Sequence, residues 1–300
     1  MAGGLVVKEL ASAASTPAAG YSVLYPKSDN LWYFKDEAGV ERSLLGNLPA
    51  NWMQGLIQAN NAIDSINDLN ISAGACRDTT DVHNITLSAI TKQSDVNWAV
   101  GTNAGGLDTG AVGNNDYYIW AIKRSDTGVS DVLFSLSSAS PTMPTSYDFR
   151  RLIGWFKRVG GTIVTFTTYE TEGGGVELLW TTPTLDVNLA ATLTTARRTD
   201  AVKVPLGFST IAHLNVAFND AAGGSFIIVY CPDQSDAAPS VTVAPIYNVG
   251  TGDGTVANAS TGGQYHIRTS SAGLIAARGS IATMDLYIVS TQGFRWARRN

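Results

Sequence analysis

Three histidines, His83, His213 and His266, are the side chains of this sequence with the widest range of possible chemistry. Nucleophilic hydrolysis needs a Ser or Cys beside a His that an acid orients, and no Gly-x-Ser-x-Gly elbow marks such a nucleophile. The histidines lie more than fifty residues apart, so they do not share the short spacing of a local metal motif. The sequence therefore favours structural or surface histidines, and it predicts no cofactor.

Three carboxylates, Glu170, Glu172 and Glu177, cluster around a glycine-rich turn. Glycoside cleavage needs only two carboxylates at a suitable separation, so this chemistry stays open as a minor alternative. A solvated hairpin tip explains the cluster more simply, because glycines and charged residues are typical of exposed turns. The sequence predicts that the chain is not an enzyme.

Two glycine-rich segments, 101–106 and 250–254, resemble phosphate-binding loops only superficially. Neither ends in the Lys-Ser/Thr of a P-loop or opens a predicted helix, so both are predicted to be turns. Asp108 and Asp253 carry oxygen ligands that suit Ca²⁺, but they lack the ordered spacing of an EF-hand loop. No metal site is predicted.

Aromatic side chains offer a different chemistry, because sugar rings are held by aromatic faces together with amide and hydroxyl groups. The chain has seven Trp and eleven Tyr. A long loop of small and polar residues, 248–263, is a candidate exposed recognition tip, although it could instead connect strands or touch a neighbouring subunit. The candidate receptor-binding residues in or beside it are Tyr247, Asp253, Asn258 and Tyr265.

Composition limits the class of partner. The chain has 300 residues, only 15% of them charged, and a net charge of −5, so no basic field points to nucleic acid. Two basic spots, Arg197–Arg198 and Arg295–Arg299, are predicted to be solvated or to pair with carboxylates across a subunit interface. Cys76 and Cys231 are predicted to be buried free thiols. No apolar run is long enough to insert in a membrane, so a soluble chain made in a cytoplasm is expected.

The elements that must position these residues are strands. Period-two and fully apolar runs recur at intervals near ten residues, as in Tyr117–Ile122, Val129–Leu136, Phe226–Tyr230 and Met284–Val289. This rhythm predicts a mainly β chain, folded as an antiparallel β-sandwich or jelly roll over residues 69–300. Turn residues at Thr181–Thr184 leave open a split into two lobes near residue 183.

The N-terminal part is predicted to contain a hairpin and one short helix. Residues 1–47 read as a tail and a β-hairpin, with strands at Tyr21–Tyr25 and Leu31–Lys35. Apolar residues then recur at spacings of four, three, four and three, which is a heptad seam over residues 48–68. The seam predicts an oligomerisation helix in a trimer, or else a helix packed on its own domain. Its members are Trp52, Leu56, Ala59, Ile63 and Ile66.

Short motifs in the N-terminal half carry a family resemblance. They include Gly20–Tyr21, Leu24–Tyr25, Leu31–Trp32–Tyr33 and the Lys-Asp-x-x-Gly of 35–39. The likeness continues in segments 73–78, 98–110, 118–135, 141–144 and 150–154. Together they resemble tail-fibre-like virion proteins of tailed bacteriophages, over residues 17–154.

The resemblance implies a structural virion protein, assembled in the host cytoplasm, that acts as a tail fibre or receptor-binding protein in host attachment. It implies a homotrimer whose residues 1–47 dock on other virion proteins. The remainder would contact a glycan or protein of the host cell surface. A capsid-bound head fibre or decoration protein is the alternative, and a glycan-degrading tailspike a less favoured one.

Overall fold

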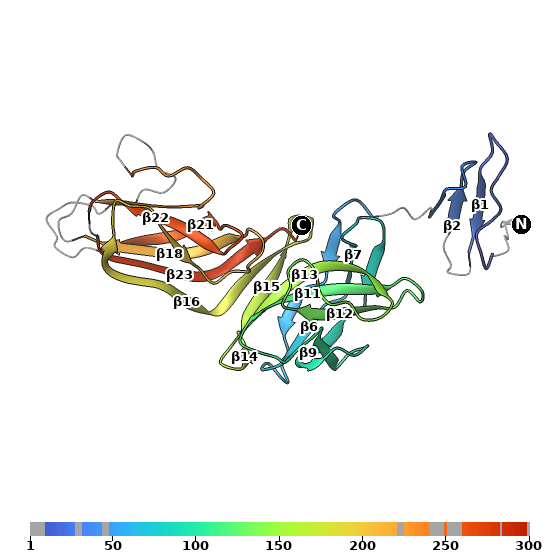
Figure 1. The fold of residues 1–300 in the computed structure, drawn as a ribbon, viewed down its shortest axis with the longest axis horizontal. Helices are drawn as coiled ribbons and strands as arrows, with labels where there is room; N and C mark the ends of the chain where they lie inside the picture. Colours follow the sequence, from blue (N-terminus) through green and yellow to red (C-terminus); the bar gives the residue numbers. More distant parts are fainter. Residues whose placement is uncertain are drawn as a thin grey trace, which may run out of the picture.

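The computed structural model of the chain describes residues 10–27, 32–43, 48–220, 225–239, 249–250, 260–282 and 284–298. Strands in five sheets make up nearly all of its regular structure, so the predicted mainly β class is confirmed. The described residues contain no α-helix, and their one helical turn is η1, a 3-10 turn at Glu172–Gly174. Figure 1 shows a small N-terminal sheet beside a central and a C-terminal group of sheets.

The predicted hairpin is confirmed as part of the N-terminal sheet, in which β1 (Val23–Pro26), β2 (Trp32–Lys35) and β3 (Glu41–Ser43) are antiparallel. Gly39 has φ +80° in the turn between β2 and β3, where Asp36 Oδ1 accepts the amide hydrogen of Val40 at 2.9 Å. Tyr25 and Lys27 both donate to the carboxylate of Glu41. These contacts close one side of a sheet that is too small to have a core of its own.

The central group combines an eight-stranded and a three-stranded sheet. The first has the order β14 (Thr162–Ile163), β13 (Tyr147–Val159), β11 (Asp116–Arg124), β12 (Ser130–Ser135), β10 (Ala104–Leu107), β9 (Ile90–Asn97), β6 (Asp68–Ile71) and β5 (Gln58–Asn60). The second has the order β4 (Met53–Gly55), β7 (Gly74–Arg77) and β8 (Asn84–Leu87). Pairing is antiparallel except that β10 runs parallel to β9 and β12. Residues Tyr117–Ile122 of β11 are buried on both faces, which explains their continuous apolar run.

The predicted helix over residues 48–68 is wrong. The segment contains β4 and β5, which pair with β7 and β6, and then a turn. Both Gly55 and Leu56 have positive φ between the two strands, a conformation that no α-helix tolerates. The seam residues therefore do not share one environment. Leu56 is buried and Trp52 is half-buried. Ala59, Ile63 and Ile66 are exposed, and Ile63 almost fully so. They do not form the single helical stripe that the seam predicted.

The C-terminal group packs a five-stranded sheet against a four-stranded one. The five-stranded sheet has the order β15 (Phe166–Thr171), β16 (Gly175–Leu193), β23 (Met284–Trp296), β18 (Ile211–Asn219) and β21 (Ser260–Arg268). The four-stranded sheet has the order β17 (Arg198–Ala201), β22 (Leu274–Gly279), β19 (Phe226–Tyr230) and β20 (Val249–Gly250). The possible lobe boundary near residue 183 lies inside β16, and whether two lobes could fold apart stays a prediction.

One cluster of buried apolar side chains runs through the central and C-terminal groups. Trp155 of β13 joins them, because its ring contacts those of Trp180 in β16 and Phe294 in β23 at centroid distances of 5.7 and 5.5 Å. Edge-to-face contacts of this kind fix relative orientation as well as burying area. The two groups therefore support each other where β16 and β23 pass the central sheet.

Candidate functional site

The candidate site is the outer face of the five-stranded sheet, on strands β16, β23, β18 and β21. Alternate residues of β18, from Ala212 to Phe218, are buried in the core, so His213 and Asn215 lie on the opposite face. Residues paired across neighbouring strands share a face, which places His266 and Gln264 of β21 beside them. The outer face is thus lined by amide, imidazole and hydroxyl groups.

The outer face is hollowed at two places. A shallow hollow of about 290 Å³ lies between β18, β21 and β23, and its lining includes Asn215, Gln264 and Ser290. A second cavity of about 370 Å³ lies at the end of the sheet, beside the hairpin that joins β15 to β16. The predicted hairpin tip at Glu172 is confirmed as exposed and forms part of its rim.

The end cavity is lined by two arginines, Arg268 and Arg295, and by two aromatic residues, Phe208 and Trp296. The rings of Phe208 and Trp296 stack at 4.5 Å with an interplanar angle of 24°, and both are largely buried. Ser209 contributes a hydroxyl that lies 3.4 Å from Arg268 Nη1. The cavity therefore offers positive charge, hydroxyl groups and an apolar surface together.

A pair of histidines lies next to this cavity. The rings of His213 and His266 are 4.4 Å apart, and His213 Nδ1 lies 3.2 Å from Glu177 Oε1. Burial lowers the pKa of His213, and the neighbouring His266 and Arg295 lower it further, whereas Glu177 opposes them. His213 is consequently held neutral at neutral pH.

Acidification below about pH 6.5 is expected to destabilise the fold in part through His213. Because the pKa of His213 is lowered in the folded chain, the unfolded chain binds the proton more readily. The stability that neutral His213 contributes is therefore present above pH 6.5 and is lost as the pH falls through its pKa in the folded chain. His213→Gln should make the fall of Tm between neutral and acidic pH shallower. His83→Gln is the matched control, since His83 is exposed and distant. Parallel Tm curves for His213→Gln and the unsubstituted chain would contradict this role.

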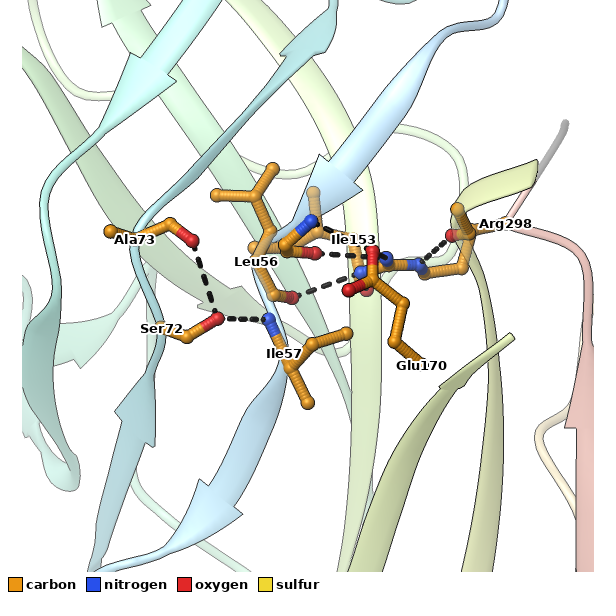
Figure 2. A network of polar contacts seen from close by, with 9 residues as sticks. Leu56, Ile57, Ser72, Ala73, Ile153, Glu170 and Arg298 are labelled. Carbon is orange, nitrogen blue, oxygen red and sulfur yellow. Dashed lines mark hydrogen bonds and ion pairs between the residues drawn. The ribbon is translucent and has the colours of Figure 1, made fainter. Parts of the chain in front are cut away.

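Arg298 holds the strand that carries Arg295 and Trp296. Its guanidinium is fully buried and donates to the carbonyl oxygens of Gly174 (2.6 Å), Gly55 (2.9 Å), Leu56 (2.9 Å) and Ile153 (3.4 Å). Figure 2 shows the side chain of Arg298 reaching from the C-terminal segment towards Leu56, Ile153 and Glu170. Burial lowers its pKa to about 10, so it stays protonated at neutral pH.

Glu170 contacts both Arg298 and the backbone of Gly55, one of the partners of Arg298. Its Oε1 accepts the amide hydrogen of Gly55 at 2.9 Å and lies 4.0 Å from Arg298 Nη2. Glu170 is thus part of a structural clamp, while Glu177 faces His213. The basic spot at Arg295–Arg299 was predicted to be solvated or at a subunit interface. This is wrong for Arg298, which is buried within its own chain.

The predicted receptor-binding residues are only partly described. Tyr265, predicted to flank the loop, lies on β21 and packs half-buried against the core. Tyr247, Asp253 and Asn258 lie outside the described residues. The proposed loop 248–263 also contains β20 and the first residues of β21, so its ends are strands.

Sequence reasoning missed Arg268 and Arg295 as a pair. Alternation in β21 could have placed Arg268 outward, because Ile267 is apolar and buried. The pairing of β21 and β23 with β18 joins segments far apart in the chain, and no local pattern indicates it.

The described residues contain no group of three or more His, Cys, Asp or Glu side chains placed to hold a metal ion. In that same part of the chain, no helix has the length and apolar character of a membrane span. Both cysteines, Cys76 and Cys231, are buried and unpaired, as the sequence predicted.

No family model matches the chain, and no curated protein matches it. Among solved structures, the chain is similar to an exo-beta-1,3-galactanase from Phanerochaete chrysosporium solved with galactose. The identity is 14%, the TM-score is 0.20, and the match covers 90% of this chain and 67% of the galactanase chain. A likeness this weak carries no argument about fold or function.

Proposed function

We propose that this chain is a structural virion protein of a tailed bacteriophage, acting as a tail fibre or receptor-binding protein in host attachment. The family assignment rests on the resemblance over residues 17–154. The observation that best supports a binding role is the hollowed, polar outer face of the five-stranded sheet. Rigid sheets that present amide and hydroxyl groups suit the recognition of surface glycans.

The N-terminal sheet supports a docking role for residues 1–47. Tyr21 is 71% exposed and Leu24 53%, and Trp32 and Val40 are also exposed. The register of β1 and β2 places Leu24 and Trp32 on the same face of the sheet, and exposed apolar side chains that share a face suit an interaction surface. The partner that we propose for this surface is another virion protein.

Homotrimerisation remains a proposal that rests on the resemblance alone, since the seam at Trp52–Ile66 is absent. Three copies would bind a repetitive host surface more strongly than one, because each later contact forms at high effective concentration. Light scattering of the purified chain should give the mass of three copies, and the mass of one would remove this part of the proposal.

Purified chain added to host cells before the phage is expected to reduce particle adsorption in proportion to its concentration. The double variant Asn215→Ala with Gln264→Ala should compete at least about tenfold less well, because it removes two amides from the outer face. Gln54→Ala with Asn97→Ala is the matched control, since it removes two exposed amides from β4 and β9 of the central group. Unchanged adsorption with folded, saturating chain would contradict the receptor-binding role. Release of reducing ends from host polysaccharide would contradict a non-enzymatic one.

A further inference from the structure

We propose that the end cavity binds the carboxylate of an acidic sugar residue, such as a uronic or sialic acid, with Arg268 and Arg295 as its anion-binding groups. The inference deepens the proposed function and rests on it, because it names the class of host glycan that the outer face would recognise.

The two arginines lie in one row across three strands. Ile211 of β18 pairs with Arg268 of β21 on one side and with Arg295 of β23 on the other. Neighbouring strands are about 4.8 Å apart, so the Cα atoms of the two arginines are separated by about 9.6 Å. Long side chains at this separation can converge on one small anion that lies above Ile211.

Neither arginine has a carboxylate partner among the described residues: no Asp or Glu oxygen there lies within the 4.0 Å of an ion pair. Glu177 lies opposite Arg295 in the strand register, but its Oε1 lies 3.2 Å from His213 Nδ1, and it is not within ion-pair distance of Arg295. Most other arginines of the described chain donate to carboxylates or to backbone carbonyls. Two exposed guanidiniums left together in a chain of net charge −5 therefore make a local anion site.

The remaining lining selects the kind of anion. A guanidinium binds a carboxylate through two parallel N–H···O bonds, which its planar fork matches. Phe208 and Trp296 are largely buried but line the cavity, so part of its wall is apolar and suits the C–H groups of a sugar. Ser209 adds a hydroxyl group to the lining, 3.4 Å from Arg268 Nη1. A carboxylated sugar ring presents a complement to each of these groups.

Glu172 argues against a plain phosphate site. Its exposed carboxylate is at the cavity rim, where it can accept hydrogen bonds from sugar hydroxyls. The same charge would repel a dianion such as phosphate more than a singly charged carboxylate. Because Arg298 fixes the end of β23, the position of Arg295 is set before any ligand arrives.

The test is calorimetric or NMR titration of the whole chain with glucuronate, galacturonate and N-acetylneuraminate, each beside its methyl ester and beside inorganic phosphate. At least one acid should bind, at least tenfold more tightly than its ester and than phosphate. Arg268→Gln and Arg295→Gln should each weaken that acid about tenfold. Arg124→Gln is the matched control, because Arg124 is a surface arginine on β11, paired with Asp126, and should leave binding unchanged.

Equal binding of all three acids and their esters, or an affinity for phosphate as high as for the acids, would overturn the inference. Unchanged affinity in both arginine variants would overturn it as well. This failure is distinct from failure of the proposed function. If the chain still blocks phage adsorption while acidic sugars neither bind nor compete, the attachment role stands and only the ligand class is lost. If the chain does not block adsorption but binds the acid, the cavity stands and the attachment role fails.

Discussion

Replacing Arg298 with Met is expected to lower the free energy of unfolding by about 3–5 kcal/mol. The variant keeps much of the side-chain volume but removes a buried cation that donates to the carbonyls of Gly55, Leu56 and Gly174. Those carbonyls would lose their partner, and at Leu56 the bond is buried, where an unsatisfied acceptor is costly. Urea denaturation followed by tryptophan fluorescence measures the change.

Arg298→Lys and Arg124→Met serve as comparisons. Lysine keeps the charge but lacks the planar fork, so Arg298→Lys should recover part of the loss. Arg124 forms an exposed pair with Asp126 at 2.6 Å, so Arg124→Met should leave the stability nearly unchanged. A stability of Arg298→Met within about 1 kcal/mol of the unsubstituted chain would mean that the clamp does not hold the central and C-terminal groups together.

Replacing Lys92 with Met is expected to cost about 3–5 kcal/mol, because it leaves the carboxylate of Asp131 buried without its cation. Lys92 of β9 and Asp131 of β12 are fully buried and 3.1 Å apart, with β10 between their strands. Lys92 Nζ also donates to the carbonyl of Ala99 at 2.6 Å. Burial lowers the pKa of Lys92, and Asp131 opposes that shift.

The double variant Lys92→Met with Asp131→Leu separates the ion pair from its surroundings. Removing both charges avoids an unpaired buried ion, so the double variant should lose at least about 1 kcal/mol less than the sum of the two single variants. Additive losses would show that the pair itself is not coupled. The amide of Gly101, which donates to Asp131 Oδ2 at 2.7 Å, would then account for the cost of removing Asp131.

The strands were predictable because the pattern of apolar residues in each segment agrees with its burial in the fold. The run Tyr117–Ile122 is apolar and aromatic, and it forms a strand buried on both faces. The N-terminal hairpin was also predictable, since turn residues separate two short apolar segments, and the structure pairs these segments as antiparallel strands.

The false helix shows how a spacing pattern can mislead. Residues 52–66 place apolar side chains at heptad intervals, yet the same stretch is rich in Asn and Asp. Asn61 Oδ1 accepts the amides of Ile63 and Asp64, and Asp64 Oδ1 accepts those of Ile66 and Asn67. Such side-chain bonds compete with helical hydrogen bonds and stabilise turns. The Asn and Asp residues of this segment therefore argue against the helix that the heptad spacing predicted.

The candidate site was less predictable than the fold. Arg268 and Arg295 meet only because β21 and β23 both pair with β18, and strand order cannot be read from alternation within each strand. Arg298 was hidden for a similar reason: its four carbonyl partners come from three separate segments of the chain.

Immunogold labelling of intact phage particles, viewed by electron microscopy, tests the attachment role most directly. Serum raised against residues 69–300 should label the tail end or baseplate if the chain is an adsorption fibre. Label spread over the capsid would contradict that role and indicate a head fibre or decoration protein, and particles without label would contradict a place in the virion.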